Sequence, residues 1–272
     1  MTADKNNASI SVKVSSSGVA RITMNRPELH NAFDDQVIKD LTRAIRKIDE
    51  NRDIRLLVLD ANGKSFSAGA DLNWMKRMAS YSWEENYQDS LKLAGLMQAL
   101  HDCSKTTIAV VQGAAFGGGV GLVACCDIVL ASDKALFCLS EVKLGLIPSV
   151  ISPYVVKAIG ERNSKRYFAT AEKFDAHEAK TINLVHKVID HQQLADYSQD
   201  FINKILANGP QAMRQAKQLV DYVLNKSIDE ELVLETAQRI ADIRASSEGR
   251  EGVSAFLEKR PANWSAVNKN EF

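Results

Sequence analysis

The sequence has 272 residues but only four cysteines, five prolines and few aromatic residues, and its formal net charge is zero. No apolar run approaches the roughly 20 residues that are needed to cross a bilayer, so we expect no contact with a membrane. The opening segment, MTADKNNASISV, carries an acidic residue early and no apolar stretch, which is not typical of a secretory signal. We therefore expect a cytoplasmic protein.

The cysteines and histidines lack the spacings of disulfide frameworks and metal sites. No C-x-x-C pair occurs, and no two histidines stand at zinc-ligand spacing on one helix. We therefore expect reduced, buried cysteines and no metal. The cysteines are Cys103, Cys125, Cys126 and Cys138.

Several functional classes are also excluded by what is missing. The 34 basic residues balance the 34 acidic ones, and no Lys/Arg run occurs, so we expect no nucleic-acid partner. The glycine-rich segment AFGGGVGLVACCD, residues 115–127, is not followed by G-K-[ST]. It also fails the dinucleotide pattern G-x-G-x-x-G, whose last glycine would fall on Leu122. A serine hydrolase of the G-x-S-x-G type is excluded as well.

The apolar pattern predicts an α/β core followed by a helical tail. Up to about residue 195, strands alternate with helices, which predicts crossover units whose loops share one edge of a sheet. We place a core domain at 1–195 and a helical region at 196–272. Strands are expected at 9–14, 19–24, 55–60, 106–113, 127–132 and 135–139. Helices are expected at 34–49, from Leu72 after an Asp71 N-cap, and at 83–102, 120–126, 194–206, 210–224, 228–245 and 251–259.

The glycine triplet 117–119 lies where a buried strand ends and an apolar helix begins. A helix N-terminus leaves backbone N–H groups unpaired, and glycines let a ligand approach them without meeting a β-carbon. This arrangement favours binding of an anion, or of a carbonyl oxygen that becomes negative. Close helix–strand packing is the alternative, and for Gly121 taken alone we favour it.

Two further segments point to the same chemistry. SFSAGADL, residues 65–72, is a second run of small residues between a buried strand and a helix, and it could supply a second N–H donor. In LSEVKLGLIP, Glu141 is a lone carboxylate among apolar residues, and burial there would raise its pKa toward a range useful for proton transfer. The alternative is that Glu141 faces water from a loop.

These three motifs, in this order, resemble the enoyl-CoA hydratase/isomerase (crotonase) superfamily. ITMNRPELHNAF and EGVSAFLEKRPANW extend the resemblance to residues 10–264. It implies an α/β fold, a crotonase-like spiral of ββα units with a C-terminal helical oligomerisation region. It also implies a homotrimer or a dimer of trimers. The implied substrate is an acyl-CoA thioester, and no other cofactor is implied.

The resemblance also assigns roles to residues. The thioester oxygen would lie between the backbone N–H groups of Ala70 and Gly118, and Glu141 would be the acid–base. The positions implied for binding the substrate or its CoA are Ser67, Ala68, Leu72, Gly117, Gly121 and Arg26.

One departure from the family pattern is informative. Typical hydratases carry a first glutamate where this chain has Gly121, and members that have only the second glutamate include double-bond isomerases. The surrounding sequence nevertheless resembles a bacterial subgroup of 3-methylglutaconyl-CoA and carboxygeranoyl-CoA hydratases, whose substrates are branched and carry a second carboxylate. We therefore expect a hydratase of such an enoyl-CoA, as in leucine or terpenoid acid catabolism, with an isomerase as the alternative. An RNA-binding or inactive member ranks below both.

A hypothesis joins these observations. The space left by Gly121 would admit the branch or the carboxylate of the substrate. Lys76, Arg77 and Lys143 lie near the motifs in sequence and could meet that carboxylate, although each could equally be an ordinary surface charge.

Overall fold

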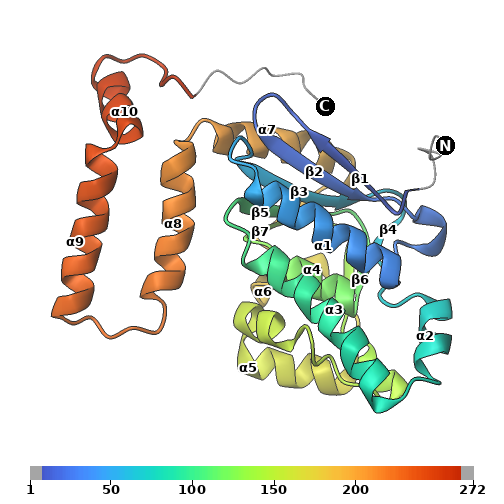
Figure 1. Cartoon of the computed structure of the whole chain (residues 1–272). Coiled ribbons are helices and arrows are strands. Elements are labelled where there is room, and N and C mark those ends of the chain that lie inside the picture. The colour runs from blue at the N-terminus through green and yellow to red at the C-terminus, as the bar shows by residue number, and fades with distance from the viewer. Residues whose placement is uncertain (1–7, 265–272) are drawn as a thin grey trace.

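The computed structural model describes residues 8–264, and its strands form two sheets (Figure 1). The larger sheet has the order β1-β2-β3-β5-β7-β10, in which β1 and β2 form an antiparallel hairpin and all other neighbours are parallel. Its strands are β1 (Ile10–Val14), β2 (Val19–Met24), β3 (Leu56–Ala61), β5 (Thr106–Val111), β7 (Ile128–Ser132) and β10 (Lys187–Ile189).

The smaller sheet has the order β4-β6-β8-β9. Strands β4, β6 and β8 are parallel to their neighbours, and β9 is antiparallel to β8. The four strands are short: β4 (Ser65–Ser67), β6 (Ala114–Phe116), β8 (Leu136–Cys138) and β9 (Phe174–Asp175). The sequence pattern placed β4 and β6 inside loops, because three residues are too few to show an apolar alternation.

Three successive units repeat one plan. In each unit the first strand joins the larger sheet, the second joins the smaller sheet, and helix follows: β3–β4–α2–α3, then β5–β6–α4, then β7–β8–α5. The predicted α/β succession of ββα units is therefore confirmed. The helices are α1 (Asp35–Glu50), α2 (Leu72–Met78), α3 (Trp83–His101), α4 (Gly118–Cys125), α5 (Ser152–Thr170) and α6 (Ala176–Thr181).

The two faces of the larger sheet are both covered. Alternate residues of β3 point to opposite faces: Leu57 and Leu59 belong to the main core with α1, α3, α4 and α5, whereas Leu56 and Val58 pack with α7 (Leu194–Leu206).

All four cysteines are buried and free, as expected, and burial raises the pKa of the Cys103 thiol to about 11.

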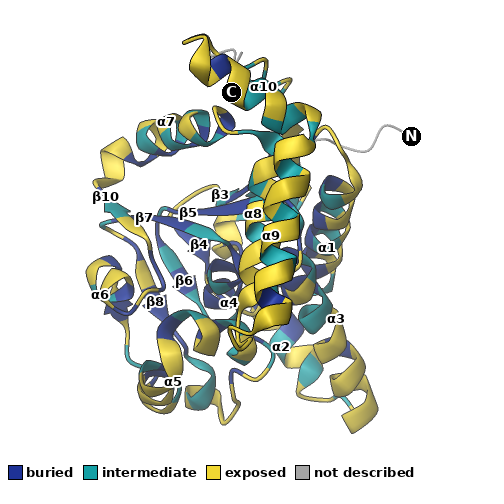
Figure 2. Ribbon diagram, turned by 90° about the vertical axis from the view of Figure 1, so that its left-hand side faces the viewer, coloured by how far each residue is buried: buried dark blue, intermediate teal, exposed yellow. Residues whose placement is uncertain are grey.

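The chain ends in three further helices, α8 (Pro210–Val223), α9 (Glu230–Ala245) and α10 (Ser247–Leu257). No strand follows β10 within residues 8–264, in agreement with the predicted helical tail. The predicted domain limits at residues 1 and 272 lie outside the described residues. Helices α8 and α9 project away from the sheets (Figure 1), and seen from that side they stand in front of them (Figure 2). No helix in the described part of the chain is long and apolar enough to span a membrane.

One polar cluster fastens α8 to the larger sheet. Asp127 Oδ2 accepts hydrogen bonds from Lys217 Nζ of α8 at 2.7 Å and from the backbone N–H of Thr107 in β5 at 2.8 Å. Thr107 is fully buried, so its N–H has no access to water. This carboxylate therefore satisfies a buried donor and pairs with a cation on the projecting helix.

We predict that Asp127→Ala destabilises the fold by about 2–3 kcal/mol, because it leaves the Thr107 N–H buried without an acceptor. Asp221→Ala is the matched control, since Asp221 forms an exposed pair with Lys157. It should change the free energy of unfolding by less than about 0.5 kcal/mol. Urea denaturation of both variants measures the difference, and equal effects would contradict the role given to Asp127.

Candidate active site

The predicted site segments follow three neighbouring strands of the smaller sheet. SFSAGADL contains β4, the glycine triplet follows β6, and Glu141 follows β8. The register pairs Ser67 with Ala115 and Phe116 with Cys138, so β6 lies between the other two. Because the three strands are parallel, their carboxyl ends lie at one edge, and segments separated by some 70 residues meet there.

The loop that carries Ala70 is held by the NRPELHNAF segment. The backbone N–H of Phe33 donates to Gly69 O at 2.7 Å, and that of Asp71 donates to Phe33 O at 2.8 Å. This parallel bridge leaves the N–H of Ala70 on the other side, where it has no acceptor among the described residues. Ala70 is itself exposed. The structure therefore presents this N–H as a free donor.

The glycine triplet presents a second donor. Gly117 donates its N–H to Cys138 O at 2.9 Å and has φ of 50°, a left-handed conformation that favours glycine. Helix α4 begins at the next residue, Gly118, two residues earlier than predicted. The N–H of Gly118 finds no acceptor in residues 8–264. It is a free donor at a helix N-terminus.

Close contacts hold the two donor loops together. A β-carbon placed on Gly69 would lie 3.2 Å from Phe116 O, and one placed on Gly118 would lie 2.8 Å from Phe33 Cε2. Phe33 thus binds the Ala70 loop through its backbone and packs against Gly118 through its ring. Both donors are fixed by the same residue.

Glu141 opens a 3₁₀ turn, Glu141–Leu144, directly beside Gly117. A β-carbon placed on Gly117 would lie 3.2 Å from Glu141 Oε1. The other carboxyl oxygen, Oε2, is buried and has no hydrogen-bond partner. Burial raises the pKa of this carboxyl above its ordinary value. The interpretation that Glu141 faces water is therefore wrong, and the carboxyl has the setting of a proton-transfer group.

The residues implied for CoA binding fall into two sets. Ala68 and Leu72 are exposed on the rim of the same loop, where they remain candidates for contact with CoA. Ser67 is fully buried, and its hydroxyl donates to Asn31 O at 2.9 Å. The side chain of Ser67 therefore holds the loop and does not face a ligand.

Arg26, implied by the resemblance to bind CoA, forms two ion pairs within the protein. Its guanidinium pairs with Asp34 Oδ2 at 2.6 Å and with Asp71 Oδ2 at 3.3 Å. Asp71 also caps α2, as predicted, by accepting from the N–H groups of Asn73 and Trp74. Two carboxylates thus neutralise Arg26, which braces the Ala70 loop from behind. The ion pairs do not favour its binding of CoA phosphates.

The hypothesis that Gly121 leaves room for the substrate is wrong. A β-carbon on Gly121 would overlap Ile151 Cγ2 and would lie 2.9 Å from Ile151 Cβ and 3.2 Å from Met97 Cε. The space beside this glycine is therefore filled by Ile151, which is buried. The alternative of close packing is the correct one.

Two residues that sequence reasoning passed over are essential to this geometry. Asn31 is buried with φ of 53°, and its amide donates to Asn62 O at 2.9 Å and to Ser65 O at 2.8 Å. Phe33 is described above. Both lie in HNAF, but nothing in those letters says that they contact a loop 35 residues away.

Two lysines lie near the Glu141 turn, Lys143 within it and Lys173 close to the Phe116 ring. The nearby ammonium groups of Lys143 and Lys173 partly oppose the rise in the pKa of the Cys138 thiol that burial causes. Lys173 Nζ also lies 5.6 Å from the centre of the Phe116 ring. Arg77 is paired with Asp35, which leaves it less suited to meet a ligand.

Among the described residues, no group of three or more His, Cys, Asp or Glu could hold a metal ion.

The sequence of this chain also matches a known family and its members. Residues 14–267 match the sequence profile of the enoyl-CoA hydratase/isomerase family. The enoyl-CoA hydratase ACTT6 of Alternaria alternata is 35% identical over 258 residues, covering 92% of this chain and 82% of its own.

Two solved structures are also similar. An enoyl-CoA hydratase from Shewanella pealeana is 45% identical with a TM-score of 0.89, over 96% of this chain and 97% of its own. A Legionella pneumophila protein assigned to the enoyl-CoA hydratase/isomerase (crotonase) group is 50% identical with a TM-score of 0.92. The match covers 94% of this chain and 99% of the Legionella chain. Sequence and architecture therefore agree over nearly the whole length, and this chain belongs to the enoyl-CoA hydratase/isomerase family and has the crotonase fold.

Proposed function

We propose that the protein adds water to a 2-enoyl-CoA thioester. The observation that carries this proposal is the buried, unpartnered Oε2 of Glu141 beside a loop with a free backbone donor. A carboxyl group whose pKa is raised by burial can take a proton and return it, and two N–H donors stabilise an oxyanion.

The proposed step uses the three elements together. The thioester oxygen accepts hydrogen bonds from the N–H groups of Ala70 and Gly118. Glu141 takes a proton from a water molecule as the water oxygen bonds to C3 of the substrate. The electron pair of the double bond moves toward the thioester oxygen, which forms an enolate. Glu141 then returns the proton to C2, so that one carboxyl group is base and acid in turn.

An isomerase is the second candidate, and one observation favours it. Residue 121 is a glycine and Ile151 fills the space beside it, so no second carboxyl group lies at that position. A single carboxyl group can remove a proton from C2 of a 3-enoyl-CoA and return it to C4. The two reactions differ in whether water enters the product.

For the substrate we propose a branched enoyl-CoA with a second carboxylate, of the 3-methylglutaconyl-CoA kind. The cations near the Glu141 turn support this proposal. Lys143 and Lys173 are exposed, and neither forms an ion pair within the described residues. They would attract a second negative charge on the substrate.

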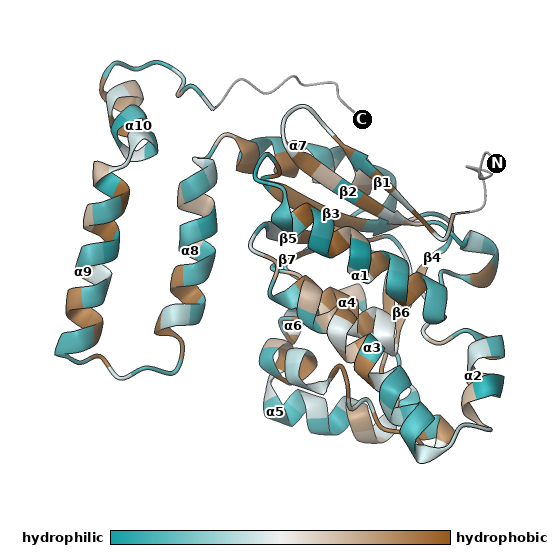
Figure 3. Cartoon of the chain, viewed as in Figure 1, coloured by the Kyte–Doolittle hydropathy of each residue, from teal (hydrophilic) through white to brown (hydrophobic). Residues whose placement is uncertain are grey.

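We also propose that the protein is a homotrimer or a dimer of trimers. The apolar side chains on α8, α9 and α10 support association, because they are large, exposed and numerous (brown in Figure 3). Val220 of α8 is 61% exposed, Leu234 of α9 64% and Phe256 of α10 82%, and Ile228 in the loop before α9 is 89% exposed. A surface of this kind marks a protein interface.

Glu141→Gln is the first test of the reaction. The wild type, given 3-methylglutaconyl-CoA, crotonyl-CoA and a 3-enoyl-CoA, should add one water to the branched acidic substrate most efficiently. The variant should lose about 10²–10⁴-fold in kcat, because general acid–base catalysis contributes that much. Product mass spectrometry measures the outcome, and Glu84→Gln on the exposed start of α3 is the matched control. Unchanged mass with a moved double bond would establish the isomerase instead.

The same variant has a predicted effect on stability. Because the pKa of Glu141 is raised by burial above its ordinary value of 4.5, ionisation costs more in the folded state than in the unfolded state. The wild type therefore loses stability as pH rises from 4.5 through the folded-state pKa. We predict that Glu141→Gln is more stable than the wild type at pH 8, by a margin that shrinks toward pH 5. Urea unfolding at both pH values measures the difference in the free energy of unfolding between the variant and the wild type. A difference that does not change with pH would contradict the burial of the Glu141 carboxyl.

Gly118→Ala tests the second donor. The added methyl group would collide with the Phe33 ring and displace the Gly118 N–H, so kcat/KM should fall about 10²–10³-fold, as for loss of one oxyanion donor. Gly95→Ala on α3 is the matched control, because nothing lies within 4 Å of the added carbon. That variant should keep full activity, and equal activity of both variants would exclude Gly118 from the site.

A further inference from the structure

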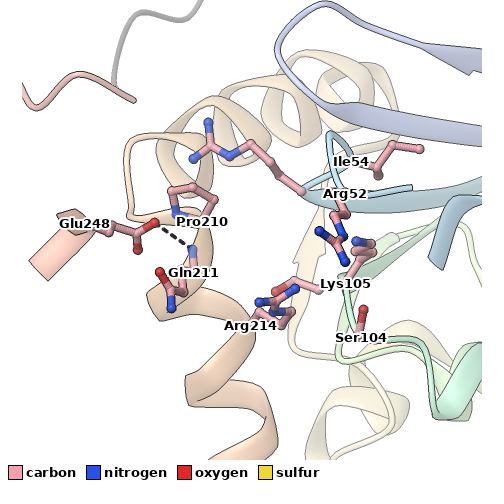
Figure 4. Close-up of a pocket in the computed structure, with 10 residues that line it drawn as sticks. Arg52, Ile54, Ser104, Lys105, Pro210, Gln211, Arg214 and Glu248 are labelled. Atoms are coloured by element: carbon pink, nitrogen blue, oxygen red, sulfur yellow. Dashed lines mark hydrogen bonds between the residues drawn. The ribbon is translucent and has the colours of Figure 1, made fainter. Parts of the chain in front are cut away.

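A cavity of about 420 Å³ lies at the amino ends of β3 and β5, where the chain enters the larger sheet (Figure 4). The donor loops and Glu141 instead follow β4, β6 and β8 at the carboxyl ends of the same units. The six-residue strands β3 and β5, each about 20 Å long, run between the two places. The cavity is thus separate from the proposed acyl-CoA site.

The cavity is lined by cations from three segments. Arg52 comes from the turn before β3, Lys105 from the residue before β5, and Arg214 from α8. Figure 4 shows these three side chains extending toward one space. None of the three forms an ion pair or a side-chain hydrogen bond with another described residue. Lys105 is only 6% exposed as a residue, whereas Arg52 and Arg214 are exposed.

Four cations line the cavity, Arg52, Arg55, Lys105 and Arg214, against one carboxylate, Glu248. Glu248 accepts hydrogen bonds from the N–H groups of Gln211 and Ala212, at 2.9 Å and 2.8 Å, and thereby caps the start of α8. Asp49 accepts from the N–H and the hydroxyl of Ser104, at 2.7 Å and 2.6 Å. A fourth cation, Arg55, donates to the carbonyl oxygens of Leu206 and Asn208. The cavity therefore keeps an excess of positive charge.

Converging cations of this kind are unfavourable without a counter-ion. Like charges that converge repel one another, and Lys105, the least exposed of the three, is screened least by water. An anion with several oxygens would accept charge-assisted hydrogen bonds from all three side chains at once. Since Arg214 belongs to α8 and the other two to the sheet edge, such an anion would also tie the projecting helix to the core.

We propose that this cavity binds a phosphate or pyrophosphate group, either as the free inorganic anion or as part of a phosphate ester. The volume accommodates either form. The proposal does not depend on the reaction proposed above.

The test is calorimetric titration of the full-length protein with inorganic phosphate, inorganic pyrophosphate and ADP, at constant ionic strength and in saturating coenzyme A. Coenzyme A occupies the proposed substrate site, so the remaining binding reports the cavity. We expect one pyrophosphate per chain. Stronger binding of ADP than of pyrophosphate would identify the ligand as an ester, and the reverse as the free anion.

Lys105→Met and Arg214→Gln should each weaken pyrophosphate binding about 10-fold or more, since each removes a hydrogen bond to a charged group. Lys187→Met, an exposed lysine on β10, is the matched control and should bind as the wild type does. Without anion, the melting temperature of Lys105→Met should equal or exceed that of the wild type, because one of three converging like charges is removed.

The proposal fails if the wild type binds none of the three probes, if coenzyme A abolishes the binding, or if both variants bind like the wild type. It also fails if the variants change the oligomeric state while the wild type binds no anion. In that case an acidic side chain of a second copy is the counter-ion.

Discussion

The parallel pairing of β4, β6 and β8 is the constraint on which the candidate site depends. Each strand has only three residues, yet each delivers one functional segment to the same edge of the smaller sheet. The strands can be so short because the first strand of each unit is anchored in the larger sheet, whose residues form the core. The site is therefore held by the core, although its own sheet is small.

A second consequence is that the two backbone donors are positioned by residues that do not touch a ligand. Phe33 bridges the Ala70 loop and packs on Gly118, Asn31 fastens the same segment to Ser65, and Arg26 braces Asp71. This is a network of buried hydrogen bonds, ion pairs and ring contacts. Glu141 is the exception, because its Oε2 is buried without a partner and so costs stability. A proton-transfer group of raised pKa requires that cost.

The sequence predicted most of the long elements, although it missed the 19-residue helix α5, and it predicted the short elements poorly. The hairpin, the helix after Asp34, the Asp71 cap and the C-terminal helices were all visible, because an amphipathic period over ten or more residues, or a capping carboxylate, is a local signal. Strands β4 and β6 were hidden in loops, since a three-residue strand shows no period. Likewise, the inward turn of Arg26 toward Asp34 and Asp71 depends on a partner 45 residues away.

The sequence by itself determined the alternation of strands and helices, the resemblance to the family, and Glu141 and the two donor loops as candidates, because these follow from local patterns and motif order. The ββα units were implied only by the resemblance. Only the tertiary structure decided that Ile151 closes the space beside Gly121, that Glu141 turns inward, and that Arg52, Lys105 and Arg214 meet at one cavity. The physical reason is that burial and charge depend on which distant segments pack together. Sheet pairing sets that packing, and no local stretch of sequence contains it.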